Sequence, residues 1–241
     1  MKQRIKRKIS HGQMSEALAT AGFLSASGGL QDAYTYLFRG KVFANAQTGN
    51  IVLLSQCVIN GEWSRALHYL IPLLSFALGV FAAELIREHF QHTVKIHWRQ
   101  LVLFVEIPLL FVVGFMPTSW NMLANSMVSF SCAMQVQAFR KVSGYPFAST
   151  MCIGNLRSCM ESLTVYLRLH HKEDLKRARR YAEIIVLFAV GAGVGGAMLS
   201  RAGSYTIWIS CGLLAVSLCL MFIREEEELH ELQDPRDGQG R

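Results

Sequence analysis

The sequence is organised around one stretch, Phe43-Ala44-Asn45-Ala46-Gln47-Thr48-Gly49-Asn50, which continues into Ile51-Val52-Leu53-Leu54. This stretch is too polar for an ordinary membrane span and too apolar for an ordinary loop. A second copy follows later in the chain, as Phe147-Ala148-Ser149-Thr150-Met151-Cys152-Ile153-Gly154-Asn155-Leu156. Because self-similarity at a fixed spacing is the signature of internal repeats, we interpret the chain as two halves, each built around one copy.

The spacing between the copies extends beyond the motif itself. Phe43-Ala44 and Phe147-Ala148 are 104 residues apart. The same offset relates two further pairs, Gly40 with Gly144 and Leu30-Gln31 with Met134-Gln135. Gly49-Asn50 and Gly154-Asn155 are 105 residues apart, which indicates one inserted residue in the second copy.

The composition is typical of a helical membrane protein. Of 241 residues, 51% are hydrophobic and only 17% are charged, whereas soluble domains carry about 25% charged residues. The charges are also segregated, with long uncharged apolar stretches between them, which favours a polytopic bundle over a large soluble α-domain. The net charge of +7 does not predict a nucleic-acid partner, because the basic residues flank apolar spans, where positive-inside topology and anionic lipids explain them.

Six apolar segments predict membrane-spanning helices, at about residues 14–38, 67–86, 98–116, 121–139, 182–200 and 205–223. We therefore predict an all-α fold, a polytopic transmembrane helical bundle of two pseudo-symmetric halves, residues 11–116 and 117–224, each with a polar, glycine-containing motif helix. A basic N-terminus, residues 1–10, and an acidic tail, residues 225–241, flank the two membrane repeats.

Small residues predict where these helices approach one another closely. In the first segment Ala21, Ser25 and Gly29 recur at every fourth position. In the fifth, Gly191 and Gly195 form a GxxxG pair, which predicts a helix contact within the chain without requiring a dimer.

Two topologies compete, with eight crossings if both motif stretches span the membrane and six if neither does. In the six-span arrangement the basic residues at 87–99, at 140–141 and at 168–180 all lie inside, together with both termini. Only Arg39, Lys41, Arg65 and Arg201 then lie outside, so the positive-inside rule favours six spans. Three crossings per half invert the second half relative to the first, a recurrent transporter design with broken or re-entrant helices.

The polar motif residues are candidates for lining a cavity, because non-helical backbone at membrane depth is tolerated only if it is buried in protein or faces a cavity. These candidates, with Gln135 from the fourth segment, are Asn45, Gln47, Thr48, Asn50, Gln135, Ser149, Thr150 and Asn155. Gly49 and Gly154 are expected to permit tight turns and close approach. The alternative is that these polar groups hydrogen-bond between helices and hold the bundle together.

Three ionisable residues lie at membrane depth, where such groups are costly and therefore functional candidates. Glu106 is the strongest, Asp32 is second and Arg157, within the second motif, is third. Three roles remain open for Glu106: it binds a proton or cation, it is a neutral structural hydrogen-bonder, or it is an ionised partner of Arg157.

No sequence pattern points to an enzyme, a cofactor or a metal site. The GxSxG, HExxH, P-loop and dinucleotide-binding patterns do not occur in a suitable context. His89, His92 and His97 lack convincing ligand spacing, and the six cysteines form no CxxC pair. We expect no catalytic residues, no cofactor and no metal.

At several of its motifs the sequence resembles the YoaK family of bacterial integral membrane proteins. The resemblance is carried by Gly29-Leu30-Gln31-Asp32-Ala33, the first motif copy, Met134-Gln135, Phe139-Arg140, Gly154-Asn155 and the glycine-rich fifth segment. It therefore extends over nearly the whole chain. It implies a protein of the bacterial cytoplasmic (inner) membrane with about six helices, and it brings no established substrate, activity or cofactor.

The leading functional hypothesis is a transporter or channel for a small solute or ion, because polar, glycine-containing motifs are duplicated at membrane depth. The alternative is a non-transporting membrane scaffold or regulatory partner, whose basic patches and acidic tail dock cytosolic proteins or anionic lipids. The expected partners are the lipid bilayer and a small-molecule or ion substrate.

The six-span topology predicts that both termini and the basic patch at 168–180 face the cytoplasm, because positive charge resists translocation. Topology reporters fused at Lys172 and after Arg224 should both give cytoplasmic signals. An external signal at Lys172 would contradict the six-span arrangement.

Overall fold

The structure is a computed structural model that describes residues 2–90, 98–142, 145–146 and 150–233. Within these residues eight α-helices account for nearly all of the regular structure: α1 (Lys2–Phe38), α2 (Gln47–Ile59), α3 (Trp63–Phe90), α4 (Trp98–Phe115), α5 (Asn121–Ala138), α6 (Cys152–Leu169), α7 (Lys172–Ala202) and α8 (Ile207–Gln233). Short 3-10 turns, η1 (Thr118–Trp120) and η2 (Gly203–Thr206), begin α5 and join α7 to α8. Two two-residue strands, β1 (Lys141–Val142) and β2 (Tyr145–Pro146), pair antiparallel between α5 and α6.

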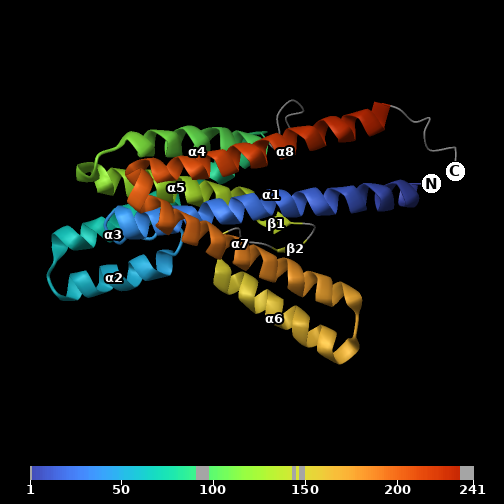
Figure 1. The fold of residues 1–241 in the computed structure, drawn as a ribbon, viewed down its shortest axis with the longest axis horizontal. Helices are drawn as coiled ribbons and strands as arrows, with labels where there is room; N and C mark the ends of the chain where they lie inside the picture. The colour runs from blue at the N-terminus through green and yellow to red at the C-terminus, as the bar shows by residue number, and fades with distance from the viewer. Residues whose placement is uncertain (1, 91–97, 143–144, 147–149, 234–241) are drawn as a thin grey trace.

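The helix α1 runs through the centre of the molecule, and the start of α1 and the end of α8 lie at the same end of the molecule's long axis (Figure 1). It packs on α7 and α8, while α3 packs on α5, and α4 contacts both α5 and α8. The short helix α2 packs on α3 and α6 packs on α7. These two hairpins project toward opposite ends of the long axis, so α2 and α6 extend away from the centre in opposite directions (Figure 1).

Each of the six apolar segments predicted from the sequence lies within a long helix, namely α1, α3, α4, α5, α7 or α8. Three stretches are long and apolar enough to cross a membrane: α3, α4 and a 52-residue run, Lys172–Ile223, that contains α7 and α8. That run would be about 78 Å long as one helix, against a hydrocarbon core of about 30 Å. It reverses direction at η2 and forms a hairpin (Figure 1).

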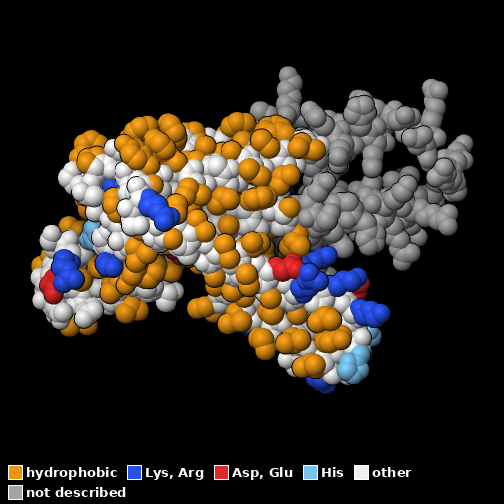
Figure 2. Space-filling model, in the orientation of Figure 1, with side chains coloured by type: hydrophobic (Ala, Val, Ile, Leu, Met, Phe, Trp, Pro, Cys, Tyr) orange, Lys and Arg blue, Asp and Glu red, His pale blue; other side chains and the backbone are white. Residues whose placement is uncertain are grey.

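The central helices α1 and α5 are less apolar than these three stretches because they carry many polar residues, and these residues face the inside of the bundle. On α1 the buried polar side chains include Ser25, Ser27, Gln31, Asp32 and Thr35, and on α5 they include Asn125, Ser129, Ser131 and Gln135. Large apolar side chains are instead exposed on the surrounding helices, and Figure 2 shows them spread over the visible face between the two ends. Lys and Arg gather mainly at the α6–α7 hairpin and at the opposite end.

Glycines allow two helix pairs to cross with their backbones in contact. A Cβ atom added at Gly191 of α7 would overlap the carbonyl of Ala26 in α1, and one added at Gly29 of α1 would overlap the carbonyl of Phe188. Between α3 and α5, a Cβ atom at Gly79 would overlap the carbonyl of Phe130. The predicted small-residue contacts are therefore confirmed within one chain.

The two motif glycines differ from expectation. Neither Gly49 nor Gly154 lies in a turn or has a positive φ, because each sits in the first turn of a helix, α2 or α6. A Cβ atom on Gly49 would lie 3.0 Å from the Phe43 ring, so close approach is confirmed there. A Cβ atom on Gly154 would meet no described residue within 4 Å, and Phe147, the counterpart of Phe43, lies outside the described residues.

The crossing of α1 and α7 gives a matched pair of substitutions. Gly191→Ala should lower stability by about 1–3 kcal/mol, because its methyl group forces the two backbones apart. Gly193→Ala should be neutral or slightly stabilising, since its Cβ faces open space and alanine favours helix more than glycine. Thermal unfolding of the purified variants in detergent measures both, and equal stability of the two would contradict the tight crossing.

Candidate functional site

One residue from each motif copy lies beside Gly28, in the C-terminal half of α1. Asn45, from the first copy, donates from Nδ2 to the Gly28 carbonyl at 3.2 Å. Thr150, from the second copy, places its side chain where a Cβ atom of Gly28 would lie. Only glycine leaves room for both side chains at this point on α1. We call Gly28, Asp32, Asn45 and Thr150 the motif junction.

Asp32 fixes the first motif copy to α1. Its Oδ1 accepts a hydrogen bond of 2.7 Å from the backbone N–H of Asn45, just before α2 begins. Negative charge is favourable at a helix N-terminus, where N–H groups lack intrahelical partners. The Asp32 side chain is itself only 8% exposed. None of the Lys, Arg or His side chains that the structure describes forms an ion pair with it.

The chain reaches Asn45 through a tight reversal after α1. Gly40 and Lys41 have φ values of 92° and 65°, a left-handed conformation that turns the chain back toward the centre. Asn50 then holds the returning segment, because its Nδ2 donates to the Phe43 carbonyl at 2.7 Å and its Oδ1 accepts from the Phe43 N–H at 3.0 Å. Gln47 closes the turn by donating to the Ala44 carbonyl at 2.8 Å. Gln47 and Asn50 thus shape the approach to the junction.

Two oxygen atoms at the motif junction are buried without a hydrogen-bond partner among the described residues. They are Asn45 Oδ1 and Thr150 Oγ1, and their side chains are 5% and 7% exposed. Buried polar atoms in folded proteins nearly always have partners, and each exception calls for an explanation such as a bound ion or water. The junction therefore presents unused acceptor capacity beside a buried carboxylate.

A second polar group, the Gln31 cluster (Ser27, Gln31, Glu106, Cys132 and Ser210), lies deeper in the bundle. Gln31 Nε2 donates to Ser27 Oγ at 2.9 Å and to Ser210 Oγ at 3.0 Å, and it reaches Glu106 Oε1 at 3.5 Å. The hydroxyls of Ser27 and Ser210 are also hydrogen-bonded to each other. Cys132 donates to Gln31 Oε1 at 2.6 Å. This cluster joins α1, α4, α5 and α8. It lies at the same height along α1 as the motif junction, because Gln31 and Asp32 are consecutive residues.

Glu106 is fully buried and only partly satisfied. Ser131 of α5 lies beside its carboxyl group, but neither the Ser131 hydroxyl nor Glu106 Oε2 makes a well-oriented hydrogen bond with a described residue. Arg157 is not its partner, because Arg157 is exposed on α6 and bonded to Glu161 at 2.8 Å. Of the three roles considered for Glu106, the ion pair with Arg157 is therefore not formed.

The remaining sequence candidates are scattered. Gln135 of α5 is buried and donates to the Leu24 carbonyl of α1 at 3.2 Å. Asn155 is buried on α6. Thr48 is exposed on α2, away from the junction, and Ser149 lies outside the described residues.

Arg39 is a buried cation whose position the sequence did not reveal. The six-span arrangement predicts that Arg39 lies on the outer side of the membrane, yet its side chain is fully buried in the protein. Its Nε donates to the Tyr34 hydroxyl at 2.8 Å, and its guanidinium also donates to the carbonyls of Val113 and Pro117 and to Asn121 Oδ1. Because these carbonyls end α4, where the helix dipole is negative, they compensate the charge without a carboxylate. No local pattern could reveal these acceptors, because they lie more than seventy residues away in the chain.

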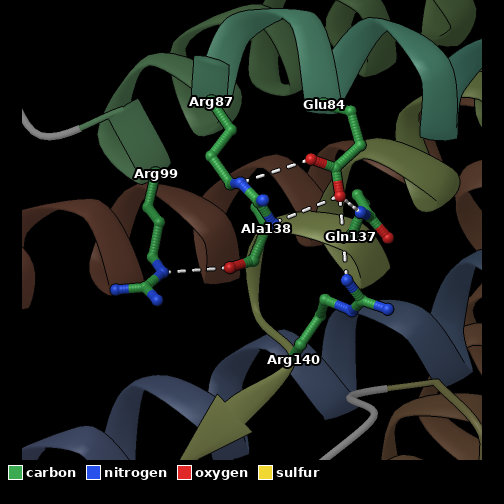
Figure 3. A network of polar contacts seen from close by, with 6 residues as sticks. All are labelled: Glu84, Arg87, Arg99, Gln137, Ala138 and Arg140. Atoms are coloured by element: carbon green, nitrogen blue, oxygen red, sulfur yellow. Dashed lines mark hydrogen bonds and ion pairs between the residues drawn. The ribbon is translucent and has the colours of Figure 1, made fainter. Parts of the chain in front are cut away.

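A further polar network ties α3 to the end of α5 (Figure 3). Glu84 of α3 pairs with Arg87 at 3.2 Å and with Arg140 at 3.7 Å, and it accepts a hydrogen bond from Gln137. Arg99 of α4 donates to the Ala138 carbonyl at 2.9 Å, which satisfies the C-terminal end of α5. This network anchors the chain just before it enters the second motif copy.

Glu106 yields a stability test of its local role. Glu106→Gln keeps an acceptor for Gln31 and should change the free energy of unfolding by less than about 1 kcal/mol, while Glu106→Leu should cost about 1–3 kcal/mol by leaving buried partners unsatisfied. Glu161→Leu, the same substitution at an exposed position, is the control and should stay within about 0.5 kcal/mol of the parent protein. Destabilisation by the Gln variant as large as that of the Leu variant would show that the charge of Glu106 is required.

Comparison with known proteins gives a family for this arrangement. The model of the family described as "Protein of unknown function (DUF1275)" matches residues 20–220. The chain is also 26% identical over 200 residues to the UPF0700 transmembrane protein YoaK of Bacillus subtilis (strain 168), covering 79% of this chain and 88% of that protein. No solved structure matches. The resemblance seen in the sequence is therefore confirmed, and this chain is a membrane protein that belongs to the DUF1275 family, to which it is matched from α1 to α8.

Proposed function

We propose that this protein is a transporter or channel for a small solute or ion, with its binding site at the motif junction. The observation that carries the proposal is the convergence of both motif copies on Gly28 in the centre of the bundle. Transporters built from repeats bind their substrates where broken helices from the two repeats meet near the middle of the bilayer. The junction combines such helix starts with a buried carboxylate and unsatisfied oxygens.

Contacts that recur at the offset of the motif repeat support the proposed inverted relation between the two halves. Ala26 and Phe130, which receive the closest glycine contacts in α1 and α5, are 104 residues apart, the offset of the motif repeat. The helix contacts between the halves are also reciprocal. Under the repeat offset α1 corresponds to α5, α3 to α7 and α4 to α8. The contact of α1 with α7 then matches that of α5 with α3, and the contact of α1 with α8 matches that of α5 with α4. In the proposed topology α2 enters from outside, α6 enters from the cytoplasm, and both stop at the junction.

The proposed orientation in the inner membrane follows from charge. The α6–α7 hairpin lies at the same end of the molecule as the start of α1 and the end of α8. It carries the basic residues Arg168, Lys172, Lys176, Arg179 and Arg180. Placing this end in the cytoplasm satisfies the positive-inside rule. It also puts the Glu84 network of Figure 3 on the cytoplasmic side, next to the entry of the second motif copy.

A non-transporting scaffold is the second candidate, and one observation favours it. In the Gln31 cluster most polar groups bond to one another, as interhelical polar groups do when they hold a membrane bundle together. The two candidates differ in one physical property. A transport site must be reached by water from at least one side, whereas a structural centre stays dry.

Thiol labelling of Thr150→Cys separates the two candidates, because Thr and Cys are similar in size. The background chain has its native cysteines replaced by Ala or Ser, and the reagent is a membrane-impermeant maleimide applied from either side. Labelling of Thr150→Cys is expected from the cytoplasmic side. Val128→Cys, in the apolar core of α5, is the unreactive control, and Ser64→Cys, exposed at the start of α3, is the reactive one. If Thr150→Cys is as unreactive as Val128→Cys while Ser64→Cys reacts, the transport proposal fails.

A further inference from the structure

The unsatisfied atoms at the motif junction define the chemistry of a ligand. Both Asn45 Oδ1 and Thr150 Oγ1 are oxygens on side chains that are more than nine-tenths buried. Asn45 and Thr150 both lie against Gly28, and the Asn45 backbone is bonded to Asp32. Oxygen acceptors beside a carboxylate call for a positively charged ligand or a hydrogen-bond donor.

An anion does not fit the junction, although a helix N-terminus often attracts one. Backbone N–H groups around the start of α2 already have acceptors: Asn45 donates to Asp32, Gln47 to the Asn45 carbonyl at 2.8 Å and Gly49 to the Ala46 carbonyl at 2.9 Å. Asp32 also brings negative charge to this position, which would repel a second anion in a medium of low dielectric constant.

Charge balance selects a monovalent cation. Asp32 is the one carboxylate of the junction, and none of the cationic side chains in the described part of the chain pairs with it. The fully buried cation Arg39 donates instead to Tyr34 and to acceptors at the end of α4 and the start of α5. A divalent ion would leave excess charge in the membrane interior, where uncompensated charge is costly. The described residues also contain no group of three His, Cys, Asp or Glu side chains able to hold a metal ion.

We propose that Asp32, Asn45 and Thr150 bind a sodium-like alkali cation at the motif junction. The Asp32 carboxylate supplies the charge, while Asn45 Oδ1 and Thr150 Oγ1 supply neutral oxygen ligands. The idea that this cation is transported, or drives transport of another solute, rests on the proposed function. As a bound ion it stands on the geometry alone, and binding can be measured without any flux.

Sodium binding is tested with the full-length protein in detergent, at constant ionic strength with choline chloride replacing NaCl. A ligand that binds only the folded state raises Tm as its concentration passes the Kd. The parent protein should therefore show a saturable rise in Tm with NaCl and saturable binding of radioactive sodium in equilibrium dialysis. Asp32→Asn keeps an acceptor for the Asn45 N–H but removes the charge, so it should abolish both effects.

Thr150→Val and Thr48→Val form the matched pair. Both replace a hydroxyl with a methyl group in a motif, but Thr48 is exposed and lies outside the junction. Thr150→Val should raise the apparent Kd for sodium about tenfold or more, a loss of about 1.4 kcal/mol or more. Thr48→Val should bind sodium like the parent protein.

Three results would overturn the cation site. An equal effect of NaCl on the parent protein and on Asp32→Asn would mean that the salt acts non-specifically. No sodium effect, with a pH-dependent Tm shift that Asp32→Asn removes, would mean that the junction binds only a proton. Absence of any sodium effect or sodium binding in the parent protein would also reject the site.

The outcome is separable from that of the labelling experiment. Sodium binding with an unreactive Thr150→Cys variant would identify a structural cation in a scaffold, so the transport proposal would fail and the cation site would stand. A reactive Thr150→Cys variant without sodium binding would leave a water-accessible junction whose ligand is not an alkali cation, so the cation site alone would fail.

Discussion

The constraint on which this structure depends is that polar groups at membrane depth must be satisfied by protein, since the bilayer core offers no water. The hydrogen bond from the Asn45 N–H to Asp32 meets this requirement where the chain leaves helical geometry. Asn50 and Gln47 meet it for the backbone between Phe43 and α2. With these groups satisfied, a non-helical segment can enter the bundle and bring the first motif copy to Gly28, in the C-terminal half of α1.

The same constraint explains why α1 lies at the centre. Its polar side chains need partners on several sides, and they find them on α4, α5, α8 and the first motif copy. Glycines at the crossings of α1 with α7 and of α3 with α5 then let backbones touch. Van der Waals packing and interhelical hydrogen bonds hold such bundles together, because lipid gives no hydrophobic drive for helices to associate.

Arg39 and Asp32 differ in how the bundle compensates their charge. Buried polar atoms without a hydrogen-bond partner among the described residues occur outside the motif junction as well, as at Glu106 Oε2 and Ser129 Oγ. Arg39 shows how fully the bundle compensates even a buried charge, using the carbonyl end of α4 in place of a carboxylate. Asp32 sits equally deep without a cation, beside unsatisfied oxygens of Asn45 and Thr150. This contrast between the two charges, together with the meeting of both motif copies at Gly28, is the physical basis for proposing a binding site at the junction.

The sequence alone determined the helices, because apolar runs and small-residue spacing are local features. It predicted all six long helices, the close contacts at Gly29 and Gly191, and Asp32 and Glu106 as deeply placed acids. Only the tertiary structure decided which distant groups meet. Thr150 reaches Gly28, Gln31 bonds to Ser210, and Arg39 bonds to α4, while Arg157 pairs with Glu161 and not with Glu106. Those outcomes depend on how helices far apart in the chain cross, and no local pattern encodes them.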